Sequence, residues 1–122
     1  MISKKFVATW CKDLIDSWIK VDYDSILNIF GEIESYYEDP FSSPGSTTED
    51  IQGYWEEIKY QKINELKMEP LVIENNSAVI RWYLDYNDTR TDEHFVMDGI
   101  YHVEFNEHQR CKKFTQWWVL EE

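Results

Sequence analysis

The sequence predicts an α+β domain in which three N-terminal helices pack on a strongly curved, mixed or antiparallel sheet around an internal pocket. Three observations predict this architecture. Apolar residues recur at helical spacing in the first half of the chain and alternate at strand spacing from residue 60 onward. Short polar links separate the strand-like segments, which is typical of antiparallel hairpins. Aromatic residues make up 16% of the 122 residues, and their stiff side chains suit the walls of a pocket.

The first predicted helix covers residues 3–20, where an apolar side chain recurs at every fourth position from Phe6 to Trp18. This spacing places the apolar side chains on one face of a helix. A second helix is expected to begin at Asp22 or Asp24, because either carboxylate could cap the first turn. Both helices would present their apolar side to the same core.

A short strand is expected over residues 32–39, ended by Pro40, and the proline- and glycine-containing stretch after it is typical of a loop. Thr47 or Thr48 then begins a helix-capping pattern. The third helix is expected to run from that cap through Ile58. The chain of 122 residues is long enough for a single domain, 1–122, with one core.

Four strands are expected in the second half of the chain, near residues 61–73, 77–87, 94–105 and 110–120. Neighbouring residues in a strand point to opposite faces, so Trp117 and Trp118 cannot both face the helices. An apolar patch on the outer face usually marks an interface. We therefore expect a homodimer through the outer sheet face, where Tyr83, Trp117 and Val119 lie.

The charge balance limits the partners of this chain, because twelve basic and twenty-four acidic residues give a net charge of −12. Such a surface repels the phosphates of nucleic acids and of anionic lipids, so neither is an expected partner. No apolar run approaches the length of a membrane span, and Lys12 and Asp13 interrupt the N-terminal apolar stretch. A cytoplasmic protein is expected.

The two cysteines, Cys11 and Cys111, lie far apart in the sequence and belong to no metal-binding pattern. Two reduced thiols are expected in a cytoplasmic protein. No phosphate-binding glycine loop, zinc spacing or Ser/His/Asp arrangement is recognisable. We therefore expect neither a metal nor a cofactor.

Three strings, in this order and spacing, make the chain resemble the nuclear transport factor 2-like superfamily, and within it the SnoaL-like and ketosteroid isomerase-like families. They are DYDSILNIF at 22–30, YEDP at 37–40 leading to IQGYW at 51–55, and the stretch from MDGI at 97–100 to the Trp pair at 117–118. The resemblance implies a cone-shaped fold with a pocket at its wide end and frequent homodimers. It does not fix the function, because this fold carries enzymes and binding proteins alike.

The resemblance also implies a candidate catalytic residue. Glu38-Asp39-Pro40 matches the string whose Asp moves a proton in the isomerases, and a carboxylate at the edge of an apolar pocket gains basicity from desolvation. The alternative is a turn residue, since Asp before Pro commonly accepts hydrogen bonds from the local backbone. Of the two positions where the isomerases keep a donor to the substrate oxygen, one holds Leu14 and the other holds Tyr101. Steroid isomerase activity is therefore not expected, whereas other acid–base chemistry stays open.

Three functions are consistent with the sequence. The first is a SnoaL-like pocket protein that binds a small apolar or aromatic molecule, because the inner face is rich in aromatic residues. The second is an acid–base enzyme of isomerase, cyclase or dehydratase type with Asp39 as the base and Tyr101 as a donor. The third is a dimerisation or scaffold module without a ligand. The expected pocket residues are Trp10, Leu14, Trp18, Tyr37, Trp55, Trp82, Met97, Tyr101, Gln116 and Trp118.

Overall fold

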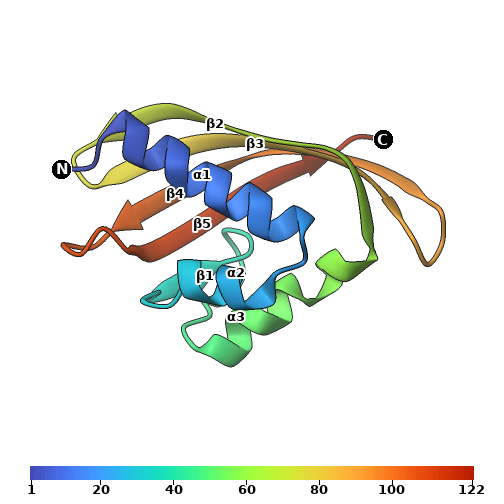
Figure 1. The fold of residues 1–122 in the computed structure, drawn as a ribbon, viewed down its shortest axis with the longest axis horizontal. Coiled ribbons are helices and arrows are strands. Elements are labelled where there is room, and N and C mark those ends of the chain that lie inside the picture. Colours follow the sequence, from blue (N-terminus) through green and yellow to red (C-terminus); the bar gives the residue numbers. More distant parts are fainter.

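The computed structural model describes all residues from 1 to 122 and has the predicted α+β architecture. Helices and a short strand come first, and a run of long strands follows (Figure 1). The elements are α1 (Lys4–Ile19), α2 (Tyr23–Ile29), β1 (Ser35–Tyr37), α3 (Thr48–Trp55), the 3-10 helix η1 (Glu56–Tyr60), β2 (Gln61–Glu74), β3 (Ser77–Asp88), β4 (His94–Phe105) and β5 (Cys111–Leu120).

Side-chain caps fix where the helices begin. Asp22, rather than Asp24, caps α2 by accepting a hydrogen bond from the Ser25 N–H group at 3.1 Å. Thr47, rather than Thr48, caps α3 and forms a reciprocal capping box with Asp50. The third helix is shorter than expected, because the α-helical turns end at Trp55 and the chain continues as η1.

The five strands form one mixed sheet in the order β1-β5-β4-β3-β2. The four long strands are antiparallel neighbours, whereas β1 pairs with β5 in parallel, so that Tyr36 lies opposite Phe114. Irregularities in the pairing of β2 with β3 fall between Ile63 and Glu65 and near Pro70. Such bulges bend a strand, and the sheet curves over the helices (Figure 1).

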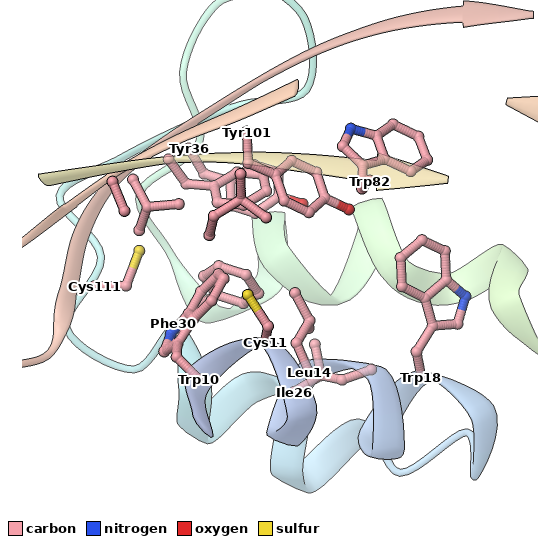
Figure 2. Packing of buried hydrophobic residues seen from close by; sticks show 14 of the residues in the cluster. Trp10, Cys11, Leu14, Trp18, Ile26, Phe30, Tyr36, Trp82, Tyr101 and Cys111 are labelled. Carbon is pink, nitrogen blue, oxygen red and sulfur yellow. The ribbon is translucent and has the colours of Figure 1, made fainter. Parts of the chain in front are cut away.

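The core fills the space between the helices and the concave face of the sheet. Twenty-two buried apolar residues form one cluster, to which α1, α2, α3 and the inner face of β3, β4 and β5 all contribute (Figure 2). The alternation predicted for β3 is confirmed, because Ile80, Trp82 and Leu84 are all buried. The C-terminal half of β5 extends past this cover, and Trp117 and Trp118 are 43% and 46% exposed.

Candidate ligand-binding cavity

A cavity of about 240 Å³ lies between α1, β1, the α3–η1 segment and the inner face of the sheet. It is formed beside the main core, where the helices separate from β3 and β4. Seven of its fourteen lining residues are aromatic. The lining consists of Trp18, Tyr36, Glu38, Tyr54, Trp55, Glu57, Ile58, Gln61, Trp82, Leu84, Tyr86, Met97, Tyr101 and Gln116.

Aromatic contacts hold the walls of the cavity in place. The ring of Trp18 meets the ring of Trp55 edge to face at 4.9 Å between centroids, so α1 is joined to α3. Across the cavity the ring of Trp82 stacks on that of Tyr101 at 5.3 Å, joining β3 to β4. Figure 2 shows Trp18 facing Trp82, with the Tyr101 hydroxyl group pointing toward Trp82. These stiff side chains give the cavity a fixed shape.

Six of the residues expected from the sequence line this cavity: Trp18, Trp55, Trp82, Met97, Tyr101 and Gln116. Trp10 and Leu14 are instead packed in the core, where Trp10 contacts the rings of Phe30 and Phe105. Trp118 lies near the end of β5 and lines a separate groove beside the loop at Asp39–Phe41. Tyr37 does not line the cavity either.

The strand β1 contributes to the cavity through different residues from those expected. Tyr36 and Glu38 line it, whereas Tyr37 and Asp39 do not. Neighbouring residues of a strand face opposite sides, so an offset of one residue turns Tyr36 and Glu38, rather than Tyr37 and Asp39, toward the cavity. The parallel pairing with β5 sets this offset, because it places Tyr36 over Phe114 with the rings stacked at 4.6 Å.

Asp39 serves the turn that follows β1. Its carboxylate accepts hydrogen bonds from the Ser42 hydroxyl at 2.6 Å and from the Phe41 N–H group at 2.8 Å. The Ser42 hydroxyl contributes most to holding the pKa of Asp39 below its ordinary value, followed by the Phe41 N–H group. A carboxylate that is bonded in this way and lies outside the cavity is poorly suited to act as a base inside it.

Glu38 is the carboxylate that lines the cavity. Burial, followed by the charge of neighbouring Asp39, raises its pKa above the ordinary value of a glutamate. No hydrogen bond or basic group holds its charged form, and none of the salt bridges in the molecule includes it. Glu38 therefore has what Asp39 lacks, namely a position in the cavity and a free carboxylate.

Several hydrogen-bond donors beside the cavity have no partner in the protein. The Nε1 atoms of Trp55 and Trp82 are buried and unpaired. Trp55 lies next to the Tyr36 hydroxyl without satisfying the geometry of a hydrogen bond. Burial raises the pKa of Tyr101 far above the ordinary value, which keeps its hydroxyl protonated. Buried donors are usually paired, so these unpaired groups are exceptions within the protein.

Two other polar groups of the lining, Gln61 and Glu57, are already paired. The Gln61 Oε1 atom accepts a hydrogen bond from the Trp18 Nε1 atom at 2.7 Å. Glu57 forms a salt bridge with the Arg90 Nη1 atom at 2.9 Å. The polar groups left for a ligand include Glu38, Gln116 and the unpaired donors.

Two other hollows lie away from this cavity. One of about 480 Å³ is bounded by the loop at Asp39–Phe41 and by Ile100, Trp117 and Val119. The other, of about 740 Å³, is lined by Ile15 of α1 and by β2, β3 and β4. Four of its five charged groups pair, Arg81 with Asp98 and Lys67 with Glu65, and Glu69 is exposed. Neither contains an unpaired buried polar side chain apart from Trp82, which also borders the second hollow.

The structure contains no group of three or more His, Cys, Asp or Glu side chains placed to hold a metal ion. Cys11 and Cys111 are both free and buried, and burial raises the pKa of the Cys11 thiol to about 12. None of the helices combines the length and the apolar character needed to cross a membrane.

The arrangement of three helices on a curved mixed sheet is shared with several solved structures. One is the epoxide hydrolase/cyclase-like enzyme SalBIII, which has a role in pyran ring formation in the polyether salinomycin. The TM-score is 0.71 at 11% identity, over 95% of this chain and 89% of SalBIII. The chain has a SnoaL-like, nuclear transport factor 2-like fold.

Two bacterial proteins described as polyketide cyclases share the SnoaL-like fold. The one from Xanthomonas campestris pv. campestris has a TM-score of 0.70 at 8% identity, covering 93% of this chain and 90% of the other. The SnoaL-like one from Mesorhizobium loti has a TM-score of 0.63 at 12% identity, covering 91% and 97%. No protein-family model and no curated protein matches the sequence. At such low identity the similarity defines the fold and not the reaction.

Proposed function

We propose that this SnoaL-like protein binds a small, flat, largely apolar molecule that carries an oxygen acceptor in the aromatic cavity. The observation that carries the proposal is the Trp82 Nε1 donor, which is buried beside the cavity without a partner. An unpaired buried donor costs about 1–3 kcal/mol, and an acceptor on a ligand would remove that cost. The aromatic walls would supply most of the apolar contact.

The size of the cavity limits the ligand to about one or two rings. A cavity of about 150 Å³ is enough to hold one benzene molecule, and drug-sized ligands occupy roughly 300–1,000 Å³. The cavity of about 240 Å³ lies between these two cases. A monocyclic or bicyclic ketone, phenol or quinone meets both the size and the need for an acceptor.

Titration with 1-indanone, followed by tryptophan fluorescence, tests this proposal. The native protein is expected to bind the ketone. Trp82→Phe keeps a ring at the same place but removes the donor, so binding should weaken by about threefold to tenfold, the equivalent of one hydrogen bond. Trp117→Phe, on the outer face, is the matched control and should bind like the native protein. Failure of the native protein to bind ring ketones, or equal weakening in both variants, would contradict the proposal.

A second candidate function, acid–base catalysis, is favoured by the position of Glu38. A cavity carboxylate with a raised pKa is a competent base, and Tyr101 could donate to an oxygen that becomes negatively charged. Under this proposal Glu38 takes the role that the sequence suggested for Asp39. Exchange of the α-protons of 1-indanone in deuterated water, measured by NMR, tests it. Exchange that is no faster than in buffer, or that is equally fast in Glu38→Gln, would exclude this chemistry for that ketone.

A further inference from the structure

The charges around the aromatic cavity are unbalanced. Two of its fourteen lining residues, Glu38 and Glu57, are acidic, and none is lysine, arginine or histidine. Glu57 is neutralised by Arg90 at 2.9 Å on the exposed side. Glu38 is left as a half-buried carboxylate without a counter-ion, in a protein whose net charge is already −12. A cation entering the cavity would therefore be attracted both locally and at long range.

Aromatic rings surround the place where such a cation would bind. Glu38 shares the cavity wall with Tyr36 and Tyr54, whose rings stack at 5.0 Å. Trp18 and Trp55 line the same cavity and meet edge to face at 4.9 Å between ring centroids. A cation over the face of tryptophan or tyrosine is stabilised by about 0.5–2 kcal/mol, and quaternary ammonium ligands are commonly held in cages of such rings.

We infer that the ligand of this cavity carries a positive charge: a small aromatic or alkyl ammonium compound whose nitrogen lies beside Glu38 and whose apolar body lies among the tryptophan rings. The inference rests on the proposed function and specifies its ligand class. Gln116, whose side chain makes no hydrogen bond within the protein, lines the same cavity and adds an acceptor for an N–H group of the ligand. An oxygen elsewhere on the compound would pair with the tryptophan donors.

This inference assigns Glu38 a different role from that of a catalytic base. A cation held beside the carboxylate favours its charged form and so weakens it as a proton acceptor. Glu38 would then anchor the ligand as a permanent negative charge. The ion pair would be enclosed by rings rather than exposed to solvent, where such pairs contribute little.

A pair of probes with the same shape and different charge tests the inference. Phenyltrimethylammonium and tert-butylbenzene differ only in having a positive nitrogen or a neutral carbon at the branch point. Isothermal titration calorimetry on the native protein should show the cation binding at least tenfold more tightly than its neutral counterpart. In Glu38→Gln the preference for the cation should fall to less than threefold.

Glu69→Gln is the matched control, because Glu69 is exposed on β2 and forms no salt bridge. This substitution changes the net charge by the same amount as Glu38→Gln. It should retain the full preference, which separates the local carboxylate from the overall charge. Thermal unfolding of each variant verifies that it is folded, and Glu38→Asp, which keeps the charge, should restore part of the preference. If ring ketones bind and the cation has no advantage over tert-butylbenzene, or if Glu38→Gln keeps that advantage, the inference is overturned while the proposed function stands. If ring ketones do not bind, the proposed function fails.

Discussion

Gly99 is the residue at which the cavity wall depends most on the absence of a side chain. A Cβ atom at this position would overlap the Trp117 carbonyl oxygen and lie 2.7 Å from the Trp82 Nε1 atom. The ring of Trp82 can therefore lie across β4 and stack on Tyr101 only because position 99 is glycine. One small substitution should disturb both the sheet and the cavity.

Gly99→Ala is expected to destabilise the protein by about 2 kcal/mol, because overpacking in a rigid site forces backbone shifts. Urea unfolding measures the change. Gly53→Ala is the control, since Gly53 is exposed in helix α3 and a Cβ atom there meets nothing within 4 Å. That variant should gain about 0.5–1 kcal/mol from the helix propensity of alanine. Equal effects of the two substitutions would contradict the packing described for Gly99.

Glu38 should make the stability of the folded protein depend on pH with a particular sign. Its pKa is raised in the folded state by burial and by Asp39, so the folded protein holds this proton more tightly than the unfolded chain. The contribution of protonated Glu38 to the free energy of unfolding is complete at low pH and is lost as the pH rises through the pKa of Glu38 in the folded protein. The other groups of the cavity that could titrate are tyrosines, which stay protonated in this range, and the paired Glu57.

Glu38→Gln, which cannot ionise, is therefore expected to be more stable than the native protein near pH 7. Its advantage should shrink as the pH falls toward about 4, where the native glutamate is largely protonated in both states. Urea unfolding at several pH values provides the comparison. An advantage that grows on acidification would show that the pKa of Glu38 is lowered rather than raised.

The choice between Glu38 and Asp39 could not be made from the sequence alone. The match to a known Glu-Asp-Pro string indicated Asp39 as a catalytic base. The alternative, that Asp before Pro is a turn residue, agrees with the hydrogen bonds that Asp39 accepts. Nothing local marks Glu38, because its orientation follows from the pairing of β1 with β5, far away in sequence. Trp10 and Leu14 likewise share a helical face with Trp18, and only the curvature of the sheet separates the core from the cavity.

At the scale of single elements, α3 positions more of the cavity than any other α-helix. It contributes Tyr54 and Trp55, and the following η1 contributes Glu57 and Ile58. Its first turn is held by the Thr47 hydroxyl, which accepts a hydrogen bond from the Asp50 N–H group at 3.1 Å. Loss of this cap should loosen the cavity wall together with the helix.

Thr47→Ala is expected to lower the free energy of unfolding by about 1 kcal/mol, the usual effect of removing a helix cap. Thr48→Ala is the matched control, because Thr48 is exposed in the first helical turn and makes no capping bond. It should change stability by less than about 0.5 kcal/mol. Chemical unfolding of both variants distinguishes the two positions, and a larger loss from the Thr48 variant would argue against the assigned cap.

Most elements could be predicted because their signals are local. Helical spacing with a capping residue predicted α1 and α2, and alternating runs between polar links predicted β2 to β5 to within one or two residues. The shortest element was harder to place. The strand β1 has three residues where eight were expected, and its parallel partner comes from the far end of the chain. The end of α3 was also misplaced, since no proline or glycine marks the change to a 3-10 helix at Glu56.

At the scale of the whole molecule, the outer face of the sheet remains uncovered in the single chain. Trp117 and Val119 are 43% and 71% exposed, next to the half-buried Tyr83 and Ile100. The sequence predicts that a second copy covers this face. The high net charge opposes such association at low salt, so the dimer should strengthen as salt is added.

Light scattering at moderate salt is expected to give twice the chain mass of 14.8 kDa for the native protein. Trp117→Lys should give the monomer mass, because a charged side chain in the middle of an apolar interface is costly to bury. Leu71→Lys is the control, as Leu71 is equally exposed but lies on β2 at the opposite edge of the sheet. A native protein that is monomeric at every salt concentration would remove the dimer from the account.

We expect the cavity between the helices and the sheet, rather than the groove beside the loop at Asp39–Phe41, to be the binding site. The protein has six tryptophans, three of which line the cavity and two of which line that groove. Their indole N–H signals can be resolved by ¹H–¹⁵N NMR and assigned with single Trp→Phe variants. On addition of phenyltrimethylammonium, the signals of Trp18, Trp55 and Trp82 should shift while those of Trp117 and Trp118 stay in place. Shifts confined to Trp117 and Trp118, or no shifts at all, would contradict the claim.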